Sequence, residues 1–496
     1  MIRTRWIVAH ARLAAAAVST LPAMAWPHAF DDRYDLPLPL PYFVAGAAAA
    51  VGLSFVAAAL FVRSAPPPAA TQGRVVSLGP LLPVLRAACR FVALMLFALT
   101  VVAGLFGTGD PMMNLAPTLV WIVWWVGLSL MVACLGNIWP ALDPWRTLFE
   151  TMNAIARRLG RNNGIVLGCA YPRVIGAWPA VILLLALAWF EVVYPQAAVP
   201  YRLACAVLVW SALTLAGMAC FGREAWQRNA DVFAVYFATL GRFAPFTAAS
   251  DARSVVLRAP GRGLITADAG SAAMVAFVIA MLSTVLFDGM LSGQVWWLIQ
   301  SKLTRVLPRL ADGSGYIVGT IGLVGVWLVF LIAYLLTCRI TAWLVRDHPL
   351  KTIVYAFAPT LVPIAIAYNI AHNCSNLLVQ GQQVIPLLSD PFGLKWDLLG
   401  TAEYRPDIGL IDARVSWYVA IGAIVAGHVI SIWLAHRVAL REFGAQRHAV
   451  IASIPLTALM VIYTAISLSI IAEPMVKFDA QSPQAFEPGF AIRPRT

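Results

Sequence analysis

Residues 271–291 read SAAMVAFVIAMLSTVLFDGML, and this stretch decides the fold class. It contains one ionisable side chain, Asp288, among 21 residues. A run of about 20 apolar residues is long enough to cross the roughly 30 Å of bilayer hydrocarbon as an α-helix. Hydrocarbon offers the backbone no hydrogen-bond partner, so a span of this kind has to be helical. We therefore expect residues 271–291 to form a transmembrane helix.

The composition of the whole chain agrees with this prediction. Of its 496 residues, 61% are hydrophobic and 12% are charged, and the mean hydropathy is +0.79. Soluble domains average roughly 45–50% apolar and about 25% charged residues. The seven cysteines form no CxxC pair, and we interpret them as small buried side chains. These features exclude a soluble globular protein, a disordered chain and a disulfide scaffold.

Ten apolar stretches are long enough to cross a bilayer. The predicted fold is all-α: a polytopic transmembrane helix bundle with about ten spans after a signal peptide, and with interfacial amphipathic helices. We expect the interfacial helices at 143–161, from Phe233 to Phe246, and at 293–310. The ten predicted spans are 41–62, 87–106, 115–136, 174–194, 200–221, 271–291, 315–338, 352–373, 416–436 and 450–472.

The N-terminus has the pattern of a secretory signal. Three arginines precede the short apolar run LAAAAVSTLPAMA, which ends at Ala25 in an A-x-A pattern. Cleavage after Ala25 is expected, and an uncleaved first anchor is the alternative. The predicted domain organisation is a signal peptide at 1–25, one helical bundle at 26–472 and a C-terminal tail at 473–496. Within the bundle, 374–415 is expected to be an outer cap and 222–270 an inner loop.

The distribution of basic residues predicts the orientation. With the mature N-terminus outside, the predicted inner segments hold 21 Lys and Arg residues and the outer segments hold 11. Basic residues are retained in cytoplasmic loops, so this bias predicts a bacterial inner-membrane protein with both mature termini in the periplasm. The formal net charge of +12 is explained in this way. No basic cluster interleaved with aromatic residues stands out, so the lipid bilayer is an expected partner and nucleic acid is not; the sequence identifies no protein partner.

Few ionisable residues lie within the predicted spans, and such residues are functional candidates because burying them in lipid is costly. Glu191, Asp288 and His372 fall at a similar depth near the outer ends of three spans. Asp390 and His28 belong to outer segments that can reach the same layer. Carboxylates and an imidazole together suit acid–base catalysis or a divalent metal ion that activates water. The structural alternatives are that Asp288 ends its helix before Gly289 and that Glu191 reaches up to water.

Two further histidines lie in the ninth predicted span. His428 is near mid-membrane, and His436 lies eight residues further along on a similar face. They suit a helix–helix hydrogen bond, a proton path or a metal site in which His428 joins His372, Asp288 and His28. Cys374 beside His372 is either a soft metal ligand or a packing residue. No HExxH, CxxC, GxSxG or P-loop pattern sharpens these assignments.

The chain resembles the fenitrothion hydrolase family of polytopic membrane proteins. The most specific segment is TLVPIAIAYNIAHNCSNLLVQGQQVIPLLSDPFGLKWDLLGT at 360–401. The similarity runs from about residue 28 to the tenth span. Supporting segments are DDRYDLPLP (31–39), GTGDPMMNLAPTLVWIVWWVGL (107–128), LDPWRTL (142–148), AWFEVVYP (188–195), FGREAW (221–226) and VLFDG (285–289).

The resemblance implies hydrolysis of an apolar organophosphorus triester to a dialkyl thiophosphate and a nitrophenol. A small hydrophobic substrate of this kind partitions into the bilayer. His372, Asp288 and Asp390 are then candidate metal ligands or bases, with Glu191 in the same layer. Four residues are candidates for substrate binding: Tyr368 and Asn369 to orient the substrate, and Trp296 and Trp297 to contact an aromatic leaving group.

Two other functions fit the same residues. A transporter would line its path with mid-membrane polar groups such as His428, although no internal repeat is evident. A haem or copper protein would use His372, His428 and His436 as ligands.

Overall fold

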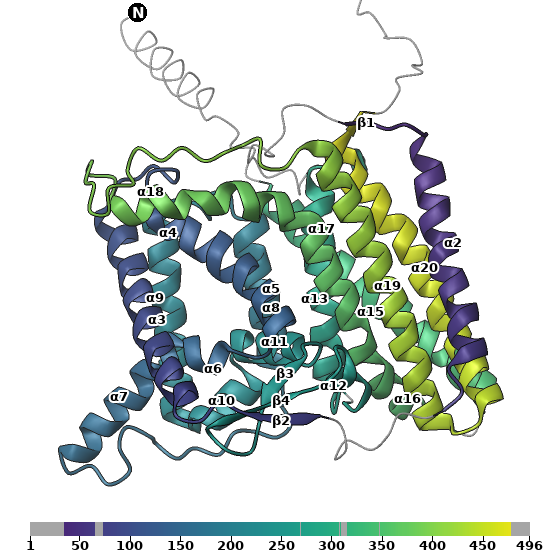
Figure 1. Ribbon diagram of the computed structural model, residues 1–496, viewed down its shortest axis with the longest axis horizontal. Helices are drawn as coiled ribbons and strands as arrows, with labels where there is room; N and C mark the ends of the chain where they lie inside the picture. Colours follow the sequence, from purple (N-terminus) through teal and green to yellow (C-terminus); the bar gives the residue numbers. More distant parts are fainter. Residues whose placement is uncertain are drawn as a thin grey trace, which may run out of the picture.

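The computed structural model describes residues 34–64, 73–267, 269–306, 308, 315–346 and 348–477. Within these ranges the protein is an all-α polytopic helix bundle, as predicted (Figure 1). The predicted signal peptide at 1–25, His28 and residues 478–496 of the predicted tail lie outside the described residues. The start of that tail, Glu473 to Met475, belongs to the last helix.

In the described ranges, nine helical segments are long and apolar enough to cross a membrane, and each matches a predicted span. The remaining predicted span, 174–194, corresponds to α8 (Trp178–Val192), whose 15 residues reach about 22 Å and are short for a bilayer. The nine are α2 (Leu40–Phe61), α3 (Leu81–Phe106), the run α4–η2–α5 (Leu115–Leu135), α9 (Pro200–Phe221), α13 (Ala272–Leu291), α15 (Tyr316–Val345), the run α16–α18 (Leu350–Ser389), α19 (Ala413–Phe443) and α20 (Gln446–Met475).

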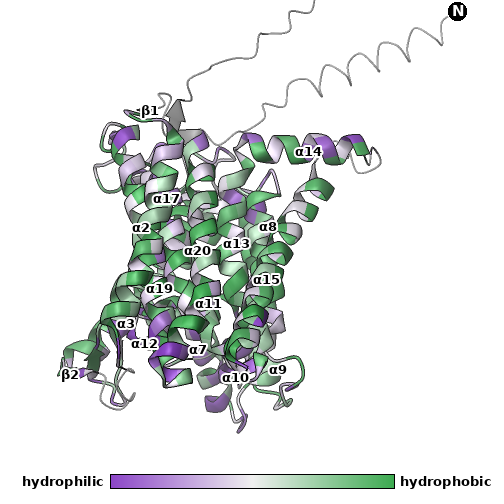
Figure 2. Ribbon diagram, turned by 90° about the vertical axis from the view of Figure 1, so that its right-hand side faces the viewer, coloured by the Kyte–Doolittle hydropathy of each residue, from purple (hydrophilic) through white to green (hydrophobic). Residues whose placement is uncertain are grey.

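Both ends of the described chain lie at the same end of the bundle. Strand β1 (Tyr34–Asp35) pairs in parallel with β5 (Val476–Lys477). Helix α14 (Gln294–Val306), predicted as an interfacial helix, lies crosswise at this end (Figure 2), which we call the α14 end. Two chain ends on one side require an even number of crossings, in agreement with the ten-span count.

The opposite end carries most of the short elements, and we call it the α7 end. Helix α7 (Pro144–Arg158) begins at Asp143, whose side chain accepts a hydrogen bond from the Arg146 N–H as an N-cap. The predicted inner loop is ordered: α10 (Arg223–Asn229) and α12 (Arg262–Ile265) flank a small sheet. The strand order of that sheet is β2 (Arg74–Ser77), β4 (Ser254–Leu257), β3 (Phe246–Ala248).

Helix α11 (Val232–Gly241) corrects the predicted second surface helix. Eight of its ten residues are buried, and it packs against α5 (Leu128–Leu135), α6 (Trp139–Leu142), α8 and α10. Its sequence VFAVYFATLG has no charged side chain and therefore no polar face to present to water. It is a short buried helix inside the α7 end of the bundle.

The predicted outer cap is also more helical than expected. The run from α16 (Leu350–Phe357) through η4 (Ala358–Leu361) and α17 (Val362–Gln380) continues into η5 (Gly381–Gln383) and α18 (Val384–Ser389). Figure 1 shows its last part, in green, lying sideways over α4 (Leu115–Pro117) at the α14 end. Only the part after Ser389 is irregular. The run and α13 are the most buried spans, so the polar side chains that they carry are shielded from lipid.

Candidate functional site

The structure brings Asp288 and His372 into direct contact. Asp288 lies one turn before the end of α13, and His372 lies in α17, which packs beside it. His372 Nε2 is 2.9 Å from Asp288 Oδ2. The side chain of Asp288 is 35% exposed and that of His372 is 16% exposed, so the pair is partly accessible near the α14 end. Two residues predicted from depth alone therefore converge laterally as well.

Tyr368 completes the wall beside this pair. It lies one helical turn before His372, its ring and the imidazole are roughly stacked with centroids 6.4 Å apart, and its side chain is 1% exposed. Its hydroxyl has no hydrogen-bond partner among the described residues. A buried hydroxyl without a partner is costly and calls for an explanation, such as a ligand that the hydroxyl binds.

Gly289 allows this arrangement because it has no side chain. A Cβ atom at this position would lie 2.6 Å from Tyr368 Oη and 3.6 Å from His372 Nδ1. The Nδ1 side of the imidazole and the tyrosine hydroxyl therefore both face the backbone of α13 next to Asp288. The sequence motif VLFDG contains this glycine, whose close approach to Tyr368 the sequence alone does not predict.

Glu191 belongs to the same group of polar residues. Its Oε2 accepts a hydrogen bond of 3.0 Å from Trp125 Nε1, and its carboxyl is within electrostatic reach of Asp288. Trp125 lies in η2 (Thr118–Gly127), a π-helix of ten residues. π-Helical turns are rare and are frequent at functional sites. Nothing in the sequence TLVWIVWWVG predicts the wider turn, so Trp125 was missed.

Asn369 is the second predicted substrate-binding residue of α17. It is 7% exposed, and its Oδ1 lacks a partner in the described part of the chain. No described hydrogen bond joins it to Asp288 or His372. Asn369 follows Tyr368 directly, so the two side chains point in directions about 100° apart around the helix axis.

The two predicted tryptophans of α14 differ in environment. Trp297 is 69% exposed, whereas Trp296 is buried and packs edge-on against Phe287, with ring centroids 5.2 Å apart. Trp296 also lines an apolar pocket of about 650 Å³ between α13, α14, α15 and α20. The α13 residues in this pocket are Leu286 and Met290, two positions either side of Asp288. They lie on the opposite face of α13, so the pocket and the polar pair are separated by this helix.

Asp390 takes part in a local turn. Its carboxylate accepts backbone hydrogen bonds from Leu394 (2.9 Å) and Lys395 (2.6 Å). It follows α18, which Figure 1 shows at the far end of the sideways segment from α13. The structure does not bring Asp390 to the Asp288–His372 pair.

The histidines of α19 do not join His372 either. His428 is buried and its Nδ1 is 2.8 Å from the Ile424 carbonyl oxygen, while its Nε2 has no described partner. His436 Nε2 is 3.0 Å from the Val62 carbonyl oxygen. Each of the three imidazoles is thus bonded to a different group. Cys374 is a free, half-buried thiol.

Few described side chains near the pair could act as metal ligands. Among the residues that the structure describes, no three His, Cys, Asp or Glu side chains are placed to hold a metal ion. Catalytic zinc sites use three protein ligands. Asp288 and His372 supply two, and they are hydrogen-bonded to each other. His28, another predicted ligand, lies outside the described residues.

No family model matches the chain, and no curated protein and no solved structure is significantly similar to it.

Proposed function

We propose that the protein is a membrane-embedded hydrolase of the bacterial inner membrane that cleaves an apolar phosphotriester of the fenitrothion type. The observation that carries the proposal is the hydrogen-bonded pair of Asp288 and His372 beside the unpartnered Tyr368 hydroxyl. The sequence resemblance supports the substrate class. The distribution of Lys and Arg supports an α14 end that faces the periplasm.

The pair has the components of a general base. A neutral His372 that donates its Nε2–H to the Asp288 carboxylate has a free lone pair on Nδ1. Nδ1 takes a proton from water as the water oxygen attacks phosphorus, and the bond between phosphorus and the nitrophenolate oxygen breaks. Asp288 orients the imidazole and stabilises its protonated form, as the carboxylate of a catalytic triad does. The proton then passes to the leaving nitrophenolate or to water.

Tyr368 has the position of a charge-stabilising donor. Its hydroxyl and His372 Nδ1 both lie close to the backbone of Gly289. A donor fixed in a site that excludes most water stabilises developing charge on the phosphoryl or thiophosphoryl group more than water does. The hydroxyl needs no reorganisation, because no other described group competes for it.

The depth of the pair suits a substrate that dissolves in lipid. Asp288 and His372 lie near the α14 end, where an oily triester from the bilayer and water from the periplasm meet. The apolar pocket lined by Trp296 is large enough for a small aromatic molecule, but it lies on the opposite face of α13 and does not place such a molecule against the pair. Metal assistance stays a prediction, tested by dialysis of the active protein against a chelator.

The experiment is nitrophenol release from fenitrothion by the purified protein in lipid nanodiscs. His372→Gln and Asp288→Asn are compared with His448→Gln, which alters an exposed histidine at the α7 end. We expect the first two variants to lose activity while their melting temperatures stay close to the parent value, and the control to keep it. Full activity in folded His372→Gln protein would refute this site, and no hydrolysis by the parent protein would refute the reaction.

Transport is the second candidate, and one observation favours it. His428 Nε2 and Ser431 Oγ are buried in α19 without described partners, three residues apart on one face. Unpartnered polar atoms in the middle of a span suit a solute or proton path. Flux of a triester into proteoliposomes without chemical change would favour this function over hydrolysis.

A further inference from the structure

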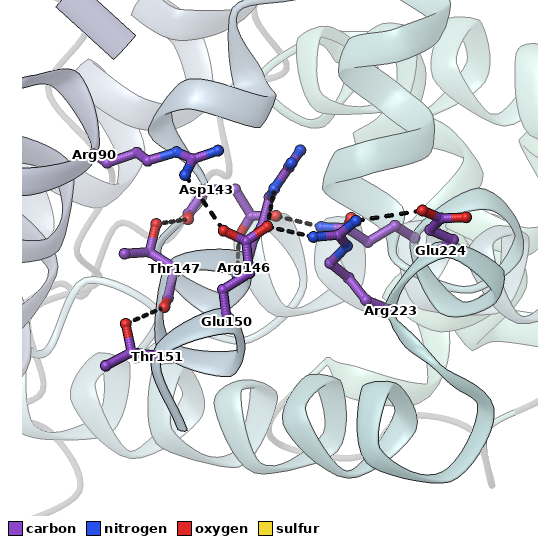
Figure 3. Close-up of polar contacts among 9 residues, drawn as sticks. Arg90, Asp143, Arg146, Thr147, Glu150, Thr151, Arg223 and Glu224 are labelled. Carbon is purple, nitrogen blue, oxygen red and sulfur yellow. Dashed lines mark hydrogen bonds and ion pairs between the residues drawn. The ribbon is translucent and has the colours of Figure 1, made fainter. Parts of the chain in front are cut away.

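A second group of polar residues lies at the α7 end of the bundle, far from the Asp288–His372 pair. Arg90 of α3, Arg146 of α7 and Arg223 of α10 surround the carboxylate of Glu150 (Figure 3). Glu150 accepts hydrogen bonds from Arg146 Nε at 2.9 Å, from Arg90 Nη1 at 3.3 Å and from Arg223 Nη1. Three guanidinium groups surround Glu150, and Glu224 pairs with one of them, Arg223, so a positive surplus remains at the junction of three helices.

A pocket of about 320 Å³ opens beside this junction. Arg146 and Arg223 line it, together with Arg228 and the side-chain amides of Asn137 and Gln227. Arg228 is exposed and forms no ion pair with any described carboxylate. The pocket thus combines three arginines with neutral hydrogen-bond donors. Glu224 also lines it, but its side chain is 77% exposed and 3.4 Å from Arg223, which leaves it free to turn into water.

The buried acidic group behind the pocket does not offset this positive charge. Gln227 Nε2 donates a 2.6 Å hydrogen bond to Asp143 Oδ2. Burial, together with the nearby charge of Asp231, raises the pKa of Asp143 to about 8. The raised pKa favours the neutral form of Asp143, which weakens its repulsion of an anion held by Gln227 and the arginines.

The exposed apolar side chains of α7 favour a position of this pocket at the membrane surface. Met152 and Ile155 of α7 are 46% and 51% exposed, and they follow the arginine cluster along the same helix. An amphipathic helix with exposed apolar side chains rests at the boundary between headgroups and acyl chains. Its first turn, with Arg146, is then at the depth of lipid phosphates. Arginine forks bind phosphate oxygens in pairs, which matches this donor set.

We infer that the pocket between α7 and α10 is a binding site for a phosphate group, carried either by an anionic lipid of the adjacent leaflet or by a water-soluble phosphate. Arg146, Arg223 and Arg228 supply the guanidinium donors, and Asn137 and Gln227 supply amide donors. This site is separate from the proposed hydrolytic site at the other end of the bundle, and it does not depend on that function.

The test is ligand-dependent thermal stabilisation of the purified full-length protein in an uncharged detergent. The probes are inorganic phosphate at constant ionic strength, dihexanoyl phosphatidic acid, and dihexanoylglycerol, which has the same acyl chains without phosphate. A ligand that binds the folded state raises the melting temperature with its concentration. We expect phosphatidic acid to stabilise the protein and dihexanoylglycerol to have no effect.

The variant Arg228→Gln decides whether the pocket is the site. Because Arg228 forms no described ion pair, this variant should fold normally and bind phosphatidic acid about tenfold more weakly, as loss of one charge-assisted hydrogen bond predicts. Arg157→Gln, which alters an exposed arginine of α7 outside the pocket, should bind like the parent protein.

Each outcome bears on the inference. Stabilisation by inorganic phosphate that is lost in Arg228→Gln supports the site and assigns its ligand to the water phase. Stabilisation by phosphatidic acid alone, lost in the same variant, supports the site and assigns its ligand to the membrane. Stabilisation by neither phosphate probe, unchanged stabilisation in Arg228→Gln, or equal stabilisation by dihexanoylglycerol overturns it.

Discussion

His372 Nε2 lies 2.9 Å from Asp288 Oδ2, although 84 positions separate the two residues in the sequence. The contact crosses from α17 to α13 near the α14 end of the bundle, where most other side chains are apolar.

If the two act as one general base, their effects on the rate are not additive. Asp288→Asn and His372→Gln should each lower the rate of triester hydrolysis by about 10²–10⁴-fold, and the double variant by no more than the larger single effect. Initial rates in nanodiscs at saturating substrate measure this. A double variant whose loss equals the product of the single losses contradicts a shared role.

Tyr368→Phe separates a catalytic hydroxyl from a structural one. The hydroxyl is buried and has no described partner, so removing it should leave the melting temperature unchanged or raise it, because an unsatisfied buried group costs about 1–3 kcal/mol. The same change should lower the maximal rate by about 10²-fold if the hydroxyl stabilises the reacting phosphoryl group. Parallel thermal melts and rate measurements check both. Reduced stability with an unchanged rate would assign Tyr368 to packing.

Gly289→Ala tests how closely α13 and α17 approach. The added methyl group would lie 2.6 Å from Tyr368 Oη, so Tyr368 has to move and the imidazole of His372 with it. We expect a large loss of activity from this one methyl group. Gly422→Ala on α19 is the matched control, since no atom lies within 4 Å of its added Cβ. Alanine favours a helix by about 1 kcal/mol over glycine, so the control should be as stable as the parent or more so. Equal activity of both variants would show that α13 and α17 do not pack closely at Gly289.

Asp143→Asn should change the pH dependence of stability. Burial and Asp231 raise the pKa of Asp143 to about 8, while Arg146 and its backbone N–H act in the opposite direction. The folded protein thus holds a proton that the unfolded chain releases near pH 4. Stability from this group is complete below about pH 4 and is lost as the pH rises towards about 8. Asparagine keeps the N-cap and cannot ionise. The advantage of the variant over the parent in melting temperature should be larger at pH 9 than at pH 5, by about 2 °C or more. An equal difference at both values would contradict the raised pKa.

The orientation of the bundle is tested with fusions. The pairing of β1 with β5 puts both chain ends at the α14 end, and the excess of basic residues predicts that this end is periplasmic. Alkaline phosphatase fused after the last residue should be active, and green fluorescent protein at the same place should be dark. Fusions at Gly444, in the turn between α19 and α20, should give the reverse. Bright C-terminal fluorescence would invert the proposed topology.

Hydropathy predicted the spans because each one is a long apolar run, and the positions of Asp288 and His372 within their spans predicted a similar depth for the two. Neither method reports how a helix is rotated about its axis, so their contact could not be derived. The π-helix that positions Trp125 has no residue-type signal. The surface helix expected from Phe233 was wrong because a ten-residue apolar segment is equally compatible with burial. The pocket between α7 and α10 was missed because it joins residues 137–146 to 223–234, and basic side chains near a membrane surface first suggest topology.

The position of α2 has a consequence for biosynthesis. This helix packs against α19 and α20, and β1 just before it pairs with β5 just after α20. The first described helix to leave the ribosome therefore meets its neighbours only when the last two have been made. Until then α2 is a single helix without these partners. The bundle is completed in a final step, in which α2 packs against α19 and α20. In a chain truncated before α19, α2 would lack both of the helices that it packs against.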